Sequence, residues 1–311
     1  MARSKMTAAS LSSWEGAEAD VFAAVARVST HPGFAAASRA LAAGMLRLSA
    51  ADRVVDGVFK DAGRYLVAMI AFSLHDKGGL TLPALKAVCA RSGMLSPGRA
   101  RAMLRFLEHC RYLERRPGGA RGGDIYSPTP AFLAAWDRHF IVSLEAASLI
   151  APDIAPLLDP PGLTPRQTYG RIHADGMMDA RQGDQVVIAF LRVFLHPFAG
   201  NHVVWTLIGA GTGFPPERAG PVSIAGLART GGTSRAQVAR IFRKAADEGL
   251  TDLGADGFVT FHGAARKELG FFYAVQLVQI QAAAAQAARL HGLDGHSKMQ
   301  RQTLLQAPEP R

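Results

Sequence analysis

Two arginine-rich segments hold the residues with the clearest capacity for chemistry. Residues 86–121 contain nine basic side chains against two acidic ones, and residues 229–244 contain five basic side chains and no acidic one. A guanidinium group forms paired hydrogen bonds with phosphate oxygens and with the edge of guanine. Basic groups clustered in this way, in a chain with a net charge of +10, indicate a surface that binds nucleic acid.

The second segment has the pattern of an amphipathic helix that follows a tight turn. Gly231 and Gly232 end one helix, and Thr233 or Ser234 is suited to cap the next one. The apolar residues of this next helix recur three and four positions apart, which predicts one buried face. They are Val238, Ile241, Phe242 and Ala245. We expect the opposite face to lie in the major groove of DNA. The residues predicted to contact DNA here are Ser234, Arg235, Gln237, Arg240, Arg243 and Lys244.

The first segment repeats this design and adds a basic hairpin. Ser96 is suited to cap a helix, and Pro97 to occupy its first position. The predicted inner stripe is Ala100, Met103, Leu104 and Leu107. The arginines of the Gly-rich hairpin that follows suit the DNA backbone or a narrow minor groove. The residues predicted to contact DNA here are Ser96, Arg99, Arg101 and Arg105 on the helix, and Arg115, Arg116 and Arg121 on the hairpin.

Each segment belongs to a half of the chain that repeats one order of elements. We expect an apolar helix, a short loop, a small helix, a turn, a longer basic helix, a β-hairpin and a closing apolar helix. The opening helices are predicted at residues 63–74 and 202–210, and the closing helices at 131–150 and 264–290. The two cap serines lie 138 residues apart. The sequence therefore predicts a mainly α fold built from a duplicated unit.

Residues 233–261, TSRAQVARIFRKAADEGLTDLGADGFVTF, resemble the recognition helix and wing of bacterial winged-helix regulators. Ser-Arg, followed by Val, Arg, an apolar pair and a terminal Gly-Leu, is similar to the pattern of the MarR-type and catabolite-activator families. The resemblance covers residues 222–261. It implies two winged helix-turn-helix units with small β-hairpin wings and flanking helices.

The resemblance also implies partners. In MarR-type proteins, helices at the ends of the fold pack against a second subunit, and a pocket between such helices binds small aromatic effectors. The helices at residues 137–150 and 271–290 would then form an internal pseudo-dimer, a homodimer or both, with an effector of unknown identity. Packing within the core is the simpler explanation of these apolar helices.

Five prolines between residues 152 and 165 indicate a connector between the halves, because proline at this density interrupts a helix. The predicted organisation is a helical N-terminal extension at 1–60, with helices at 14–30 and 33–49, and a first winged-helix unit at 61–150. A Pro-rich linker is predicted at 151–167. Residues 168–292 are predicted to form a helical insert, at about 184–195, and the second unit, and 293–311 a flexible tail.

Signals for enzyme, metal and cofactor chemistry are weak. The GAGTGF stretch at residues 209–214 lacks the Gly-Lys-Ser/Thr of a phosphate-binding loop, and no nucleophile elbow or carboxylate pair stands out. His196 and His202 flank a short turn without cysteine partners, so we expect neither a metal site nor a cofactor. Cys89 and Cys110 interrupt apolar stripes, which favours buried structural thiols over a redox pair.

Membrane and secreted classes also lack their signals. The N-terminal residues show no apolar signal-peptide core, and the apolar stretches at residues 66–74 and 186–195 are shorter than the roughly 18 residues of a membrane span. Two cysteines cannot form a disulfide framework, which fits a reducing compartment. We therefore expect a cytoplasmic protein with no membrane partner.

Together these patterns predict a non-enzymatic transcription regulator that occupies double-stranded promoter DNA. One alternative is a plasmid-type replication initiator, a class that also carries two winged-helix units. Another is a protein-interaction module of chromosome-organising complexes, although those modules tend to be acidic and this chain has a pI near 10.1. A third is a basic helix face that is merely solvated.

Overall fold

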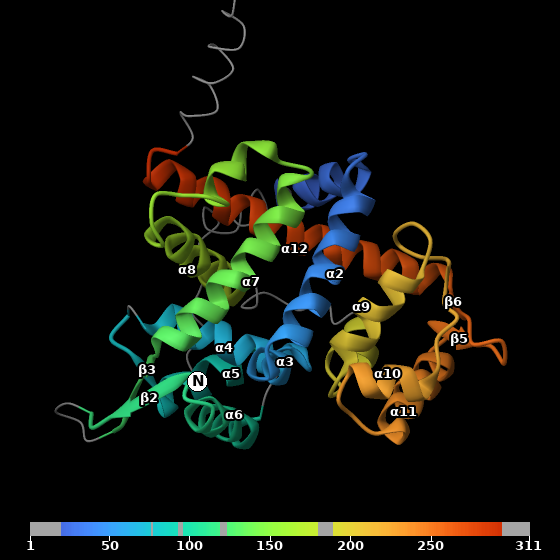
Figure 1. Cartoon of the computed structure of the whole chain (residues 1–311), viewed down its shortest axis with the longest axis horizontal. Helices are drawn as coiled ribbons and strands as arrows, with labels where there is room; N and C mark the ends of the chain where they lie inside the picture. The colour runs from blue at the N-terminus through green and yellow to red at the C-terminus, as the bar shows by residue number, and fades with distance from the viewer. Residues whose placement is uncertain (1–19, 76, 93–95, 119–122, 180–188, 294–311) are drawn as a thin grey trace, which may run out of the picture.

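The computed structural model describes residues 20–75, 77–92, 96–118, 123–179 and 189–293, and it is mainly helical with two small antiparallel sheets (Figure 1). Within these residues, no helix combines the length and the apolar character that crossing a membrane requires. The mainly α class predicted from the sequence is therefore confirmed.

Two parts of the chain repeat the same order of elements. The first segment consists of α4 (Ala62–His75), β1 (Leu80–Thr81), α5 (Leu82–Ser92), α6 (Pro97–His109), β2 (Leu113–Arg116), β3 (Ile125–Pro128) and α7 (Pro130–Ser148). The second segment consists of α9 (Gly200–Ala210), β4 (Arg218–Ala219), α10 (Ile224–Thr230), α11 (Arg235–Asp247), β5 (Thr251–Leu253), β6 (Val259–Phe261) and α12 (Gly263–Leu290). Their sheets have the equivalent strand orders β1-β3-β2 and β4-β6-β5. The predicted repetition of elements is confirmed.

The repetition extends to the turn that ends the third helix of each segment. Arg111 follows α6 and Gly249 follows α11, and both have a positive φ, of 57° and 64°. In each case the next amide donates to the carbonyl oxygen five residues earlier, at 2.9 and 2.8 Å. This is the pattern in which a left-handed residue ends a helix, and it usually requires glycine. The same backbone turn is therefore built from different residue types.

Helices outside the two segments form much of the remaining core. They are a helix at residues 20–30, α2 (Phe34–Ala51), α3 (Arg53–Phe59), the 3-10 helix η1 (Pro152–Leu157), α8 (Thr164–Asp179) and the π-helical turn η2 (Leu191–Leu195). The predicted helix at 33–49 corresponds to α2. Of the predicted helix at 14–30 and the predicted insert at 184–195, residues 14–19 and 184–188 lie outside the described residues, as do those of the predicted tail beyond 293.

The predicted Pro-rich linker is packed rather than extended. Ile154 and Leu157 of η1 are buried, and α8 already begins at Thr164. A proline at 165 is tolerated there because the first turn of a helix has no partner for its amide. The helical character of residues 164–167 corrects the prediction of a linker across the whole of 151–167.

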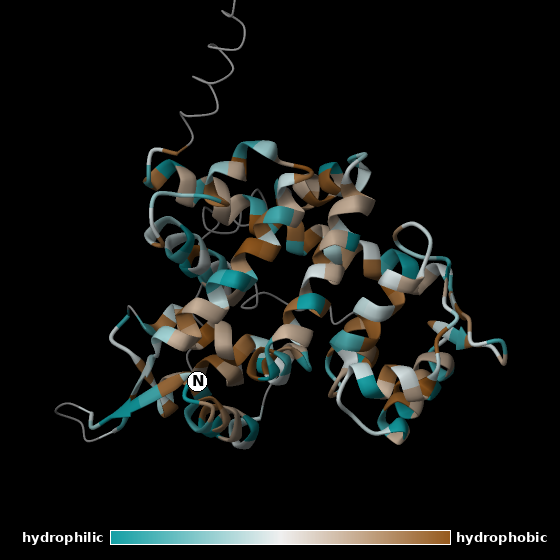
Figure 2. Cartoon of the chain, in the orientation of Figure 1, coloured by the Kyte–Doolittle hydropathy of each residue, from teal (hydrophilic) through white to brown (hydrophobic). Residues whose placement is uncertain are grey.

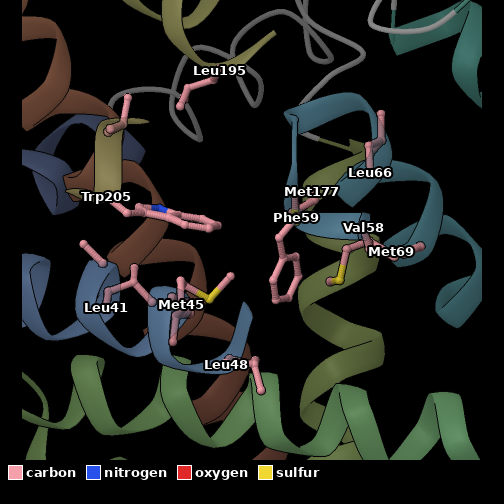
Figure 3. Close-up of a cluster of buried hydrophobic side chains, with 14 of the residues drawn as sticks. Leu41, Met45, Leu48, Val58, Phe59, Leu66, Met69, Met177, Leu195 and Trp205 are labelled. Carbon is pink, nitrogen blue, oxygen red and sulfur yellow. The ribbon is translucent and has the colours of Figure 1, made fainter. Parts of the chain in front are cut away.

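A layer of long helices joins the two segments. α12 contacts α7, α8 and η1, and α2 contacts both α7 and α9. In Figure 1, α12 extends from beside α8 to the sheet of the second segment, with α2 and α7 crossing in front of it. The buried apolar residues of both segments belong to one core cluster, part of which is drawn in Figure 3. The helices that close the two segments therefore pack within one molecule.

Two buried histidines lie in this layer. The Tyr65 hydroxyl is 3.0 Å from Nε2 of His139, and the rings of Tyr169 and His173 stack with centroids 5.7 Å apart. Burial lowers the pKa of His139 from 6.5 to about 3 and that of His173 to about 4. Both rings are therefore neutral in the folded protein at any pH above about 5, whereas the unfolded chain binds protons below about pH 6.5.

The free energy of unfolding should consequently decrease as the pH falls from about 6.5 to 4. We expect His139→Gln, which cannot titrate, to reduce this decrease by about 1.4 kcal/mol per pH unit, the value for one proton. Urea unfolding at a series of pH values measures the slope. Equal slopes for the wild type and the variant would show that His139 binds protons equally in the folded and unfolded states, which contradicts a lowered pKa.

Candidate nucleic-acid interface

The first candidate DNA-contacting helix, α6, begins and packs as its sequence predicts. The Ser96 hydroxyl accepts a hydrogen bond from the Arg99 amide at 3.3 Å, and Pro97 is the first helical residue. The predicted inner residues Ala100, Met103, Leu104 and Leu107 are all buried. Because four apolar residues fix one face of α6, the opposite face is presented to solvent.

Three arginines occupy the exposed face of α6. Arg99, Arg101 and Arg105 are exposed. Arg99 lies 3.4 Å from the buried carboxylate of Asp61, so its charge already has a partner. Arg101 and Arg105, one helical turn apart, form no hydrogen bond or ion pair with the part of the chain that the structure describes. Their guanidinium groups are free to bind an anionic ligand.

The hairpin formed by β2 and β3 carries paired rather than free arginines. Arg115 lies 3.4 Å from Glu108 and 3.3 Å from Asp124, and Arg116 lies 3.7 Å from Glu114. Figure 2 shows β2 as a strongly hydrophilic strand. Exposed ion pairs of this kind contribute little free energy, so a phosphate could replace the carboxylate partners. The third predicted hairpin contact, Arg121, lies outside the described residues.

The second candidate helix, α11, has the same construction. The Ser234 hydroxyl accepts a hydrogen bond from the Gln237 amide at 3.1 Å, which makes Ser234, and not Thr233, the cap. The predicted inner residues Val238, Ile241, Phe242 and Ala245 are buried. The apolar face of α11 therefore points into the core, as predicted, and the basic face points away from the core.

The exposed face of α11 is cationic. Arg235, Arg240, Arg243 and Lys244 are exposed, and among the described residues Arg235, Arg243 and Lys244 have no hydrogen-bond or ion-pair partner. Gln237 differs from them because it is half-buried: its Nε2 donates to the Phe198 carbonyl at 3.0 Å, and its Oε1 accepts from Arg240. The Gln237 side chain thus positions α11 in this state and is not directed at solvent.

The acidic residues of the β5–β6 hairpin have hydrogen-bond partners within the chain. Asp252 lies 2.9 Å from Nε2 of His262, and Asp256 pairs with Arg218, which lies over the Phe258 ring at 4.0 Å. Residues 251–261 of this hairpin include no Lys or Arg, whereas β2 carries Arg115 and Arg116.

Figure 1 places α6 and α11 at the same edge of the molecule, opposite the end occupied by α12 and the helix at residues 20–30. The predicted residues thus form two separate basic surfaces on a shared edge. The first is α6 with the β2–β3 hairpin, and the second is α11.

A junction between α6 and α11, at residues 56–64, was not predicted. Its only local signal is the Asp56–Lys60 pair, spaced one helical turn apart.

Comparisons of the chain with protein-family models, with curated proteins and with solved structures found no match. Among the described residues, no group of three or more His, Cys, Asp or Glu side chains is arranged to hold a metal ion. His202, one of the histidines considered for a metal site, instead pairs with Asp56 at 2.7 Å. Because the comparisons found no match, the two basic surfaces are interpreted from their own geometry and charge.

The two cysteines are free thiols in protected environments. Cys89 is buried and Cys110 is half-buried. Burial raises the pKa of Cys89 from 9.0 to about 11, and it also raises the pKa of Cys110. Because the thiolate is the reactive species, this environment favours a structural role over redox sensing.

In a Cys110→Ser variant at pH 8, we expect iodoacetamide to modify Cys89 about 100-fold more slowly in the folded chain than in the urea-unfolded chain. The factor follows from a pKa raised by about two units. Mass spectrometry of quenched samples measures both rates. Modification at equal rates would show an accessible thiolate and would restore the redox-pair hypothesis.

Proposed function

We propose that this protein binds double-stranded DNA through two winged helix-turn-helix units and acts as a transcription regulator by occupying promoter DNA. The observation that carries the proposal is the repeated helix–strand–helix–helix–strand–strand order. In it the third helix, α6 or α11, exposes cations that have no ion-pair partner within the described part of the chain. In such a unit the third helix enters the major groove, and the hairpin contacts the adjacent backbone or minor groove.

The two units are proposed to contact DNA differently. In the first, Arg101 and Arg105 face the major groove from α6 while Arg115 and Arg116 on the hairpin contact phosphates. In the second, α11 supplies the contacts through Arg235, Arg240, Arg243 and Lys244. The absence of Lys and Arg from residues 251–261 of the β5–β6 hairpin supports a second unit that depends on its helix. Two unlike units in one chain favour an asymmetric DNA site.

A replication initiator would use the same surfaces. It would select direct repeats at an origin, whereas a regulator would select single promoter sites. Once DNA binding has been established, locating the selected sequence in the genome that encodes this protein separates the two roles.

We expect the affinity for a 30-bp mixed-sequence duplex to fall steeply with salt, because each neutralised phosphate adds about 0.9 to the log–log slope. Arg101→Ala/Arg105→Ala and Arg235→Ala/Arg243→Ala should each lower the slope by up to about 2. These four residues are chosen because none of them has a hydrogen-bond or ion-pair partner among the described residues. Fluorescence anisotropy at 50 to 300 mM KCl measures the slope.

The matched control is Arg27→Ala/Arg289→Ala, which removes the same charge from exposed positions on the helix at residues 20–30 and on α12, outside the two basic surfaces. Its slope should equal that of the wild type. A control that loses as much as the test variants would mean that binding follows net charge alone. Absence of salt-dependent binding would reject the proposal.

Replacing Arg240 with Ala should relax base preference at one position of a selected site, by about 1–3 kcal/mol for a paired contact with a base. Arg240 must release Gln237 to make this contact, so Gln237→Ala serves as a control for altered helix position. Competition between single-base variants of the site measures the preference. A uniform loss across all bases would identify Arg240 as a phosphate contact.

A further inference from the structure

The junction between α3 and α4, residues 56–64 (the elbow), contacts both halves of the chain. It spans the start of the first unit in sequence, yet several of its polar groups have partners in the second. These groups are buried or half-buried, and they connect residues about 140 to 170 positions apart. The elbow therefore joins the two units through contacts between residues that are distant in the sequence.

Lys60 connects the elbow to the turn before α11. Its ammonium group lies 2.5 Å from Asp56 and donates to the Gly231 carbonyl at 2.7 Å. Lys60 is only 5% exposed. A buried ammonium group requires both a counter-charge and hydrogen-bond acceptors. Gly231 follows α10 in the turn to α11, so Lys60 directly holds the turn of the second unit.

Two further contacts fix α9 against the elbow. His202 Nε2 lies 2.7 Å from Asp56, and Asn201 Nδ2 donates to the Phe59 carbonyl at 3.0 Å. Burial disfavours the charged form of Asp56, but the hydrogen bonds and the charge interactions with His202 and Lys60 together outweigh this effect and lower its pKa. The Phe59 ring also packs edge-on against Trp205, with centroids 6.2 Å apart, within the core drawn in Figure 3.

The other side of the elbow contacts α6. The buried Asp61 carboxylate lies 3.4 Å from Arg99 and 3.3 Å from Arg64. Gly57 contacts the Phe106 ring so closely that an added Cβ would lie 2.8 Å from it. The guanidinium carbon of Arg64 is 5.8 Å from the centre of the Phe106 ring.

Arg64 completes a continuous path between the two helices. Its guanidinium group also lies over Phe198, 4.8 Å from the ring centre. The Phe198 carbonyl in turn accepts the hydrogen bond from Gln237 on α11. From α6, contacts therefore run through Phe106, Arg64 and Phe198 to Gln237, alongside the separate path through Lys60 and Gly231.

We infer that the elbow fixes α11 relative to α6 so that one chain engages a single continuous duplex with both helices at once. This inference rests on the proposed function, and it makes Lys60 a positioning residue. The ligand is then a duplex long enough to span both units, with two unlike contact segments at a fixed separation. Linked contacts raise affinity only when the geometry permits simultaneous binding.

The test measures affinity and salt slope for mixed-sequence duplexes of 10, 15, 20, 25 and 30 bp. For the wild type, both should rise at a threshold length, with affinity increasing about 10-fold or more. Lys60→Met keeps the aliphatic stem and removes the charge and the hydrogen bond to Gly231. It should abolish the threshold while leaving the affinity for the shortest bound duplex within about twofold of the wild type.

Lys267→Met is the matched control, since it removes the same charge from an exposed site on α12 and should keep the threshold. If Lys60→Met does not fold, Asn201→Ala, which removes only the hydrogen bond to Phe59, is expected to weaken the threshold in the same way.

Binding without a length threshold in the wild type overturns the inference but not the proposed function. The inference is also overturned if Lys60→Met loses the same affinity for short and for long duplexes, because this would indicate a structural role only. Binding to no duplex overturns both.

Discussion

The relative position of the two repeated segments depends on one buried polar group, the Lys60–Asp56 ion pair with the neighbouring His202. Lys60 and His202 are almost fully buried, and the group includes a backbone carbonyl of the turn before α11. A buried ion pair is a weak source of net stability, because desolvation offsets the attraction, but removing one partner is strongly unfavourable. Its main consequence here is geometric: few other arrangements of α3 and α9 satisfy all of these groups together.

The layer of long helices supplies the apolar part of the same junction. α12 contacts α7 and α8, and α2 contacts α7 and α9, so elements from both segments share one core. The terminal helices that the MarR-type resemblance associates with subunit contacts are used here within a single chain. The layer leaves α6 and α11 at a common edge, away from it.

Local features of the fold could be predicted from the sequence because they depend on residues near one another in the chain. The inner stripes of α6 and α11 followed from apolar spacing, and both serine caps from the residue before the helix. α8 was missed because its polar, glycine-containing sequence follows a proline cluster and lacks a clear apolar stripe. The elbow was missed because its partners are distant in sequence, and periodicity carries no information about such pairs. The inward orientation of Gln237 escaped prediction for the same reason.

The most direct test of two-unit binding is a hydroxyl-radical footprint of the full chain on a duplex selected from a random-sequence pool. We expect one monomer to protect two segments of unlike sequence on the same duplex, with a fixed separation in independently selected sites. Protection of a single segment, or of two segments whose separation varies from site to site, would contradict two helices held in one position.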